Sequence, residues 1–142
     1  MAIYAIARRT TNTTSGASAH TIYTAATDRA ALLEAGIFMG AATASTYSLG
    51  RPAAAGITPT SPVLLLAEDP GGPAATVNSA LAWATSPTNP TNDLRRWASP
   101  ATIGTGVIFT FPRGLIIAIS ANFVLQNLAT NGAVDSYFVV DE

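Results

Sequence analysis

His20 is the only histidine of this 142-residue sequence and the side chain best suited to acid–base chemistry near neutral pH. Together with a serine and a carboxylate it would act as the base of a hydrolase, but no Gly-x-Ser-x-Gly elbow is present. A single histidine in a chain without cysteine does not make a zinc site either. Because His20 follows a Thr/Ser-rich segment, we expect it at the surface or in an interface, as a pH-responsive contact.

The carboxylates offer no stronger motif. Glu68-Asp69 begin the run Glu-Asp-Pro-Gly-Gly-Pro, which predicts a solvated acidic turn rather than a calcium loop of the Asp-x-Asp-x-Asp-Gly type. The carboxylates that could pair for glycoside hydrolysis have no distinctive spacing: Asp28, Glu34, Asp93 and Asp135. Gly104-Thr105-Gly106 leads into a strand-like run, which predicts a bulge or tight turn instead of a phosphate site. We therefore expect no catalytic, cofactor or metal site and no enzymatic activity.

All seven basic residues are arginines, and four of them form the pairs Arg8-Arg9 and Arg95-Arg96. The lack of lysine is typical of a GC-rich genome, although arginine also suits interface ion pairs better than lysine does. Each pair either ends a strand in solvent or bridges to acidic surfaces of a neighbouring subunit. Trp83 and Trp97 could form a platform for a sugar, but a core or interface position is the stronger expectation. The predicted interface residues are Ile3, Tyr4, Arg8, Arg9, Arg95, Arg96 and Trp97.

Hydrophobic residues make up 49% of the sequence, whereas charged residues make up 11% and the net charge is −1. A soluble monomer usually carries about 25–35% charged residues on its surface. We therefore expect partners to cover part of the surface; the alternative is a monomer coated with Thr, Ser and Ala. No basic stripe indicates direct nucleic-acid binding. No apolar run approaches the ~20 residues of a membrane span, and the arginines follow the first apolar run, so we expect cytoplasmic synthesis and no membrane partner.

Short segments rich in β-branched and aromatic residues alternate with Gly, Pro, Asn and Asp along the chain. These segments predict strands at 2–8, 20–26, 31–41, 45–51, 63–67, 76–84, 94–98 and in three runs within 107–142. A short helix over 29–35 is the alternative to the third strand, but the alternation from Leu33 to Met39 favours the strand. About 8–10 short strands without a long helical period predict an all-β, single-domain antiparallel β-sandwich.

The chain ends are expected to differ in character. Residues 1–19 are predicted to be a first strand or a docking arm, followed by a flexible Thr/Ser-rich loop, and residues 20–142 the sandwich domain. Residues 107–142 predict a β-meander, interrupted at Pro112-Arg113-Gly114 and at the hairpin dipeptide Asn131-Gly132. In the last strand, the alternation from Val134 to Asp141 predicts one buried face.

Several segments from about His20 onward carry a family resemblance. They are Gly36-Ile37-Phe38, Ala41-Ala42-Thr43-Ala44-Ser45, Leu49-Gly50-Arg51-Pro52-Ala53, Leu94-Arg95-Arg96, the run 100–112 (Pro-Ala-Thr-Ile-Gly-Thr-Gly-Val-Ile-Phe-Thr-Phe-Pro), Val124-Leu125-Gln126-Asn127 and Tyr137-Phe138-Val139-Val140-Asp141-Glu142. The chain thereby resembles small virion proteins of tailed bacteriophages and prophages, in particular head decoration (cement) proteins. The motifs are structural rather than catalytic.

The resemblance implies a jelly-roll-like sandwich and a non-enzymatic place in the virion. Decoration proteins of this kind sit, as homotrimers, on the outer surface of the phage head and bridge neighbouring copies of the major capsid protein. The N-terminal arm, 1–19, would then clamp adjacent capsid subunits. A tail, neck or fibre component is the alternative within the virion, and a carbohydrate-binding β-sandwich module is the alternative from another class.

Overall fold

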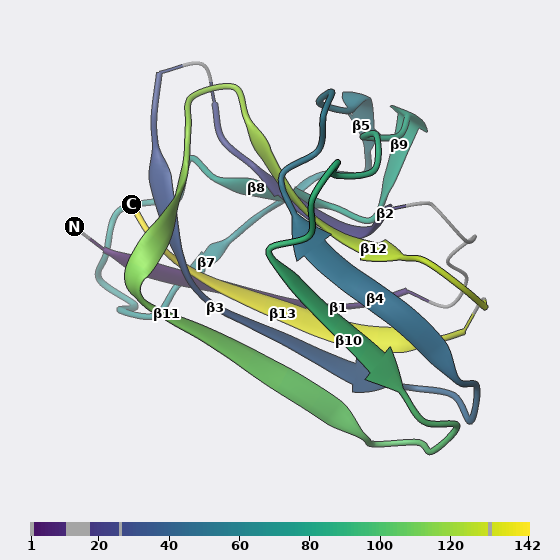
Figure 1. Ribbon diagram of the computed structural model, residues 1–142. Coiled ribbons are helices and arrows are strands. Elements are labelled where there is room, and N and C mark those ends of the chain that lie inside the picture. Colours follow the sequence, from purple (N-terminus) through teal and green to yellow (C-terminus); the bar gives the residue numbers. More distant parts are fainter. Residues whose placement is uncertain (1, 11–17, 26, 131) are drawn as a thin grey trace.

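The computed structural model describes residues 2–10, 18–25, 27–130 and 132–142, and all their regular elements are β-strands (Figure 1). Two antiparallel sheets pack against each other as a β-sandwich, as the sequence predicts. In spatial order, the first sheet consists of β11 (Gly106–Ile117), β3 (Ala30–Met39), β13 (Val134–Asp141), β1 (Ile3–Thr10) and β7 (Leu66–Ala67). The second consists of β10 (Arg95–Ser99), β4 (Ser45–Gly50), β12 (Asn122–Asn127), β2 (Ser18–Tyr23), β8 (Asn78–Ala80) and β6 (Val63–Leu64).

The eight longer strands have the connectivity of a jelly roll. Along the chain these strands alternate between the two sheets, except that β4 and β10 follow each other in the same sheet. As a result β1, β13, β3 and β11 are neighbours in one sheet and β2, β12, β4 and β10 in the other. Residues 51–94 form an insertion between β4 and β10. The insertion adds β7 beside β1 in the first sheet, adds β8 and β6 beside β2 in the second, and forms a hairpin of β5 (Ile57–Thr60) with β9 (Ala82–Thr85).

The predicted β-meander over 107–142 is wrong. Its three strands lie in both sheets: β11 and β13 flank β3, whereas β12 lies between β2 and β4 in the opposite sheet. Pro112-Arg113-Gly114 does not end β11 but forms an irregularity in its pairing with β3, where Gly114 adopts φ +66°. The connection from β12 to β13 crosses between sheets and is therefore no hairpin; Asn131 lies outside the described residues.

Other expectations are confirmed or refined. The strand predicted at 31–41 is β3, and the turns at Glu68-Asp69 and Gly104-Thr105 are present. The strand predicted at 63–67 divides into β6 and β7 because Leu65 is buried and the chain passes from one sheet to the other. The segment 76–84 likewise divides between β8 and β9, and β5 was not predicted.

The core lies between the sheets and follows the predicted alternation. In β13, every second residue from Val134 to Val140 is buried, whereas the intervening residues are only partly covered. The largest fully buried side chains include Tyr47, Phe123, Phe138, Ile22, Leu32, Ile37, Met39, Leu49, Ile117 and Leu125. No helix of the described residues is long and apolar enough to cross a membrane.

The N-terminal segment is a strand of the sandwich rather than a detached arm. β1 pairs with β13 over its whole length, from Ile3 opposite Asp141 to Thr10 opposite Val134, and also pairs with β7. The division predicted from the sequence, between residues 1–19 and 20–142, would therefore separate β1 from the sheet to which it belongs. Residues 11–17 of the predicted flexible loop lie outside the described residues.

Candidate interaction surfaces

The predicted interface residues of β1 lie on both of its faces. Ile3 and Arg9 are exposed on the outer face of the first sheet, whereas Tyr4 is buried in the core. Arg8 also faces the second sheet, where its guanidinium donates to the Ser79 hydroxyl at 3.2 Å. Partial burial lowers the pKa of Arg8. Tyr4 therefore belongs to the core and is not presented to a partner, whereas Arg8 links the two sheets and stays partly exposed.

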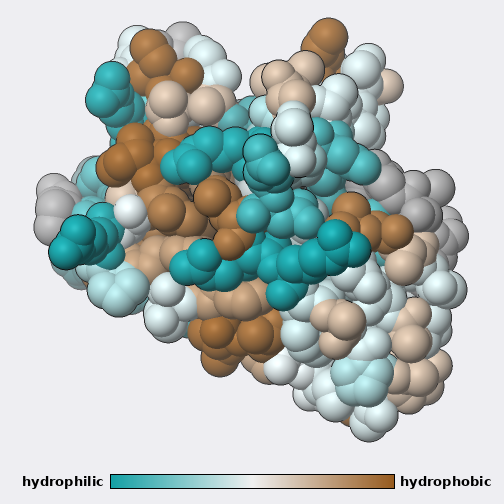
Figure 2. All heavy atoms as spheres, viewed as in Figure 1, coloured by the Kyte–Doolittle hydropathy of each residue, from teal (hydrophilic) through white to brown (hydrophobic). Residues whose placement is uncertain are grey.

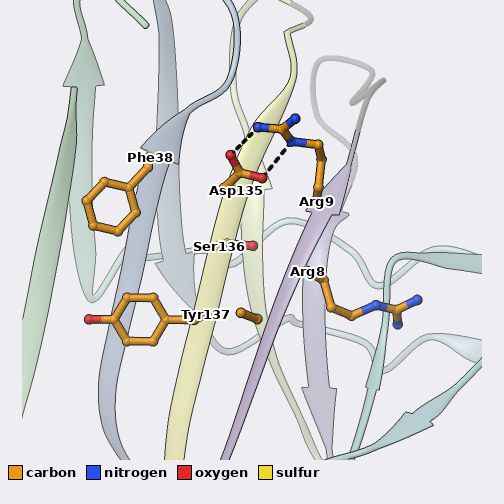
Figure 3. Close-up of a pocket in the computed structure, with 7 residues that line it drawn as sticks. Arg8, Arg9, Phe38, Asp135, Ser136 and Tyr137 are labelled. Atoms are coloured by element: carbon orange, nitrogen blue, oxygen red, sulfur yellow. Dashed lines mark hydrogen bonds and ion pairs between the residues drawn. The ribbon is translucent and has the colours of Figure 1, made fainter. Parts of the chain in front are cut away.

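Arg9 lies over Asp135 on the outer face of the first sheet, and Arg8 points away from this pair (Figure 3). Arg9 Nε and Nη2 donate to the two Asp135 carboxylate oxygens at 2.7 and 2.5 Å, a bidentate geometry that cross-strand pairing allows. The hydrogen bonds from Arg9 lower the pKa of the Asp135 carboxyl. Together with Phe38 and Tyr137, the pair lines a depression of about 390 Å³.

Arg9→Ala is expected to lower the melting temperature only slightly, because both side chains of the pair are solvent-exposed. The difference from wild type should disappear in about 1 M NaCl, where exposed charges are screened. Thermal unfolding followed by circular dichroism measures both effects. Asp135→Asn is the matched control and should give the same small, salt-sensitive change; a large loss at either salt concentration would contradict a solvated pair.

Two aromatic rings of this face cover glycines on the neighbouring strand. Tyr137 lies over Gly36 and Phe38 lies over Gly106, and a Cβ atom at either glycine would overlap the ring. The two rings are nearly parallel, with centroids 6.4 Å apart (Figure 3). The Tyr137 hydroxyl donates to Glu34, and burial together with this bond raises the pKa of Tyr137 to about 12. The outer face of the sheet is therefore partly apolar, and the two rings fill the space above the glycines.

The second arginine pair lies at an edge of the sandwich, because β10 is the outermost strand of its sheet. The Arg95 guanidinium lies 5.1 Å from the ring centroid of Phe111 in β11, a cation–π contact between the two sheets. Arg96 is exposed beside Asp93, with a closest approach of 3.6 Å. Trp97 packs against Tyr47 and belongs to the border of the core.

We name this side the β10–β11 edge: β10, β11, the turns that adjoin β11, and Arg51. Arg51 follows β4 and donates to the Ile116 carbonyl at 2.9 Å, with its guanidinium over Phe123. Figure 2 shows hydrophobic residues gathered along β11 with hydrophilic residues beside them. The exposed arginines of this edge are Arg51, Arg95, Arg96 and Arg113. Sequence reasoning missed Arg51 and Arg113, because neither stands in a pair.

We name the other side the β6–β7 edge: β6, β7, the acidic turn after β7, and the adjoining ends of β1 and β13. Here Ile3, Glu68 and Asp69 line a depression of about 500 Å³. Glu142 accepts hydrogen bonds from the Thr76 backbone and side chain, which attaches the end of the chain to the insertion. The two paired-arginine segments thus do not meet, since β10 belongs to the β10–β11 edge whereas β1 is separated from β11 by β13 and β3.

The prediction of a surface position for His20 is wrong. The side chain is fully buried between the sheets, packs against Phe138 and forms a 2.8 Å hydrogen bond through Nδ1 with the Ser136 hydroxyl. Burial, with a smaller contribution from the nearby Arg8 charge, lowers the pKa of His20 to about 3. Nε2 has no hydrogen-bond partner. His20 is thus a neutral core residue, and an exposed pH-responsive contact is excluded.

The remaining candidate chemistry gains no support from the geometry. Within the described residues, no three His, Asp or Glu side chains gather closely enough to hold a metal ion. Trp83 packs edgewise on Tyr23, donates to Thr21 and covers Gly56, so its ring is engaged within the protein. Both tryptophan rings are partly buried, and each packs on a tyrosine. The chain matches no protein-family model, no curated protein and no solved structure.

Proposed function

We propose that this protein is a non-enzymatic structural component of a phage particle, a decoration (cement) protein that binds the outer surface of the head as a homotrimer and bridges neighbouring major capsid proteins. The observation that carries the proposal is the presence of two partly apolar, exposed edges on a jelly-roll sandwich. Exposed apolar groups of this kind mark contacts with other protein chains. The placement of the protein in a phage particle is inferred from the resemblance of the sequence to small virion proteins.

The mechanism follows from many weak contacts acting together. A rigid body that engages several subunits at once gains avidity, so the shell resists internal pressure without any single strong site. Because β1 is part of the sandwich, the edges would supply contacts between copies and the outer face of the first sheet would supply contacts with the capsid, rather than residues 1–19 as a free arm. Arg9, Phe38 and Tyr137 present the polar and aromatic side chains of that face.

The test is reconstitution of purified protein with phage heads that lack their decoration protein. Co-sedimentation should saturate at a copy number on the order of hundreds per particle, as a symmetric lattice of sites requires, and electron microscopy should place the density on the head surface. Binding of only tens of copies at the tail or neck would replace the proposal by the tail-component alternative. No binding to heads or whole particles would overturn it.

A further inference from the structure

The exposed large hydrophobic side chains of the described residues gather at opposite edges of the sandwich. Those of the β10–β11 edge are Ile103, Ile108, Ile116 and Ile119. Those of the β6–β7 edge are Ile3, Val63, Leu64 and Leu66. Only Ile57 of this set lies elsewhere, on the β5–β9 hairpin. Single exposed apolar residues are normal, but a group at each edge indicates that both edges are covered in the working assembly.

The same two edges carry opposite charge. The β10–β11 edge holds four of the seven arginines, with Asp93 beside them. The β6–β7 edge holds Glu68, Asp69, Asp141 and Glu142. Within the insertion, residues 52–94 contain no basic residue. Two copies placed with unlike edges together would therefore attract each other, whereas like edges would repel.

Each edge also carries a depression that side chains of a neighbouring copy could enter. Arg95, Phe111 and Arg113 line a depression of about 320 Å³ beside the irregularity of β11. The acidic depression at Ile3, Glu68 and Asp69 is the corresponding feature of the opposite edge. An outermost strand as long as β11 exposes unpaired backbone groups, which proteins usually cover or pair. The irregularity at Pro112 limits continuous strand addition, so side chains would supply most of the contact.

We propose that the β10–β11 edge of one copy binds the β6–β7 edge of a second copy of this chain, head to tail, and that repetition of this contact closes a small ring. The inference rests on the proposed structural role and specifies the partner of its exposed edges. A head-to-tail contact uses two different surfaces, so the two end subunits of an open chain each keep one free edge until the ring closes. A two-fold contact would instead place like charges together.

Two variants that each block one edge test this arrangement. Ile108→Asp places a carboxylate within the β10–β11 edge, and Leu66→Asp does so within the β6–β7 edge; burying an unpaired carboxylate in an apolar contact is costly. Sedimentation velocity should show a ring for the wild type and at least about a tenfold weaker self-association for either variant alone. Ile57→Asp is the matched control, since Ile57 is exposed outside both edges, and should assemble as the wild type does.

Mixing the two variants is the decisive step. The intact β6–β7 edge of the Ile108→Asp protein should bind the intact β10–β11 edge of the Leu66→Asp protein, giving a dimer that cannot grow further. Wild-type self-association should also weaken as NaCl increases. If the mixture stays as monomeric as its components, or if the wild type is monomeric up to about 1 mM, the inference is overturned. Self-association without binding to phage heads would contradict the proposed function alone. Head binding by a strictly monomeric protein would contradict the ring and the homotrimer, but not the role as a cement protein.

Discussion

Acidification from about pH 7 to pH 4.5 is expected to lower the free energy of unfolding by about 2–3 kcal/mol through His20 alone. His20 is buried and neutral in the folded protein, where its pKa is lowered to about 3 from the ordinary value of 6.5. The unfolded chain binds the proton over this interval and the folded chain does not. The stabilisation is therefore complete above the ordinary pKa and decreases as the pH falls toward the folded pKa.

The geometry explains why the folded protein resists protonation. The imidazole lies between the sheets against Phe138, with its Nδ1 bonded to Ser136 and its Nε2 without a partner. A proton on Nε2 would place a buried charge without a hydrogen bond, and the guanidinium of Arg8 would repel it. Asp135 does not make the free energy of unfolding depend comparably on pH between about 4.5 and 7. Its folded pKa lies below the ordinary value of 3.8, so its contribution to stability is lost only at lower pH.

Urea unfolding at a series of pH values measures the effect, and His20→Gln is the diagnostic variant. The variant should be less stable at neutral pH, because it replaces a packed aromatic side chain, but its stability should depend little on pH between about 4.5 and 7. Ser136→Ala is the matched control, since it removes the hydrogen bond and keeps the titrating group. Equal pH slopes in wild type and His20→Gln would show that another group is responsible.

Gly36→Val is expected to destabilise the protein by about 1–3 kcal/mol, although valine favours strands elsewhere. The ring of Tyr137 occupies the space that a Cβ atom at position 36 would fill. The ring cannot move aside without giving up its hydrogen bond to Glu34 and its packing beside Phe38. The substitution therefore forces the outer face of the first sheet to rearrange.

A double-mutant cycle separates this steric effect from any other. Tyr137→Ala should lower the free energy of unfolding by less than Gly36→Val does in the wild-type background. In the Tyr137→Ala background, where the ring is absent, Gly36→Val should leave the free energy of unfolding nearly unchanged. Chemical denaturation of the four proteins gives the coupling energy. Gly40→Val is a useful comparison, because a Cβ atom there would meet Ala133 without overlapping an aromatic ring. Additive costs at positions 36 and 137 would refute the contact as the cause.

The local alternation of residues was sufficient for much of the fold. The strand at β3 follows from the alternation around Ile37, and the buried face of β13 follows from the period of two through Phe138. The acidic turn at Glu68-Asp69 follows from its Pro and Gly residues. These features depend on residues only a few positions apart in the sequence, and such local patterns are enough to predict a strand or a turn.

The partners of those strands and the candidate surfaces were decided by the tertiary structure. Arg9 and Asp135 are 126 residues apart in sequence, and only the pairing of β1 with β13 brings them together. The same pairing makes residues 3–10 an inner strand instead of an arm, and the jelly-roll connectivity distributes the predicted meander over two sheets. A polar-looking sequence around His20 predicted a surface position, yet the opposite sheet covers that side chain.

The sequence by itself thus determined that the chain is all-β, where most strands lie and which face of the last strand is buried, because side-chain periodicity records burial locally. It did not determine that exposed arginines and isoleucines would collect along β11 while carboxylates and aliphatic side chains collect beside β7. That distribution exists only after non-local pairing has chosen which strands end each sheet. Edges are a property of the sheet order, and sheet order is set by contacts between distant parts of the chain.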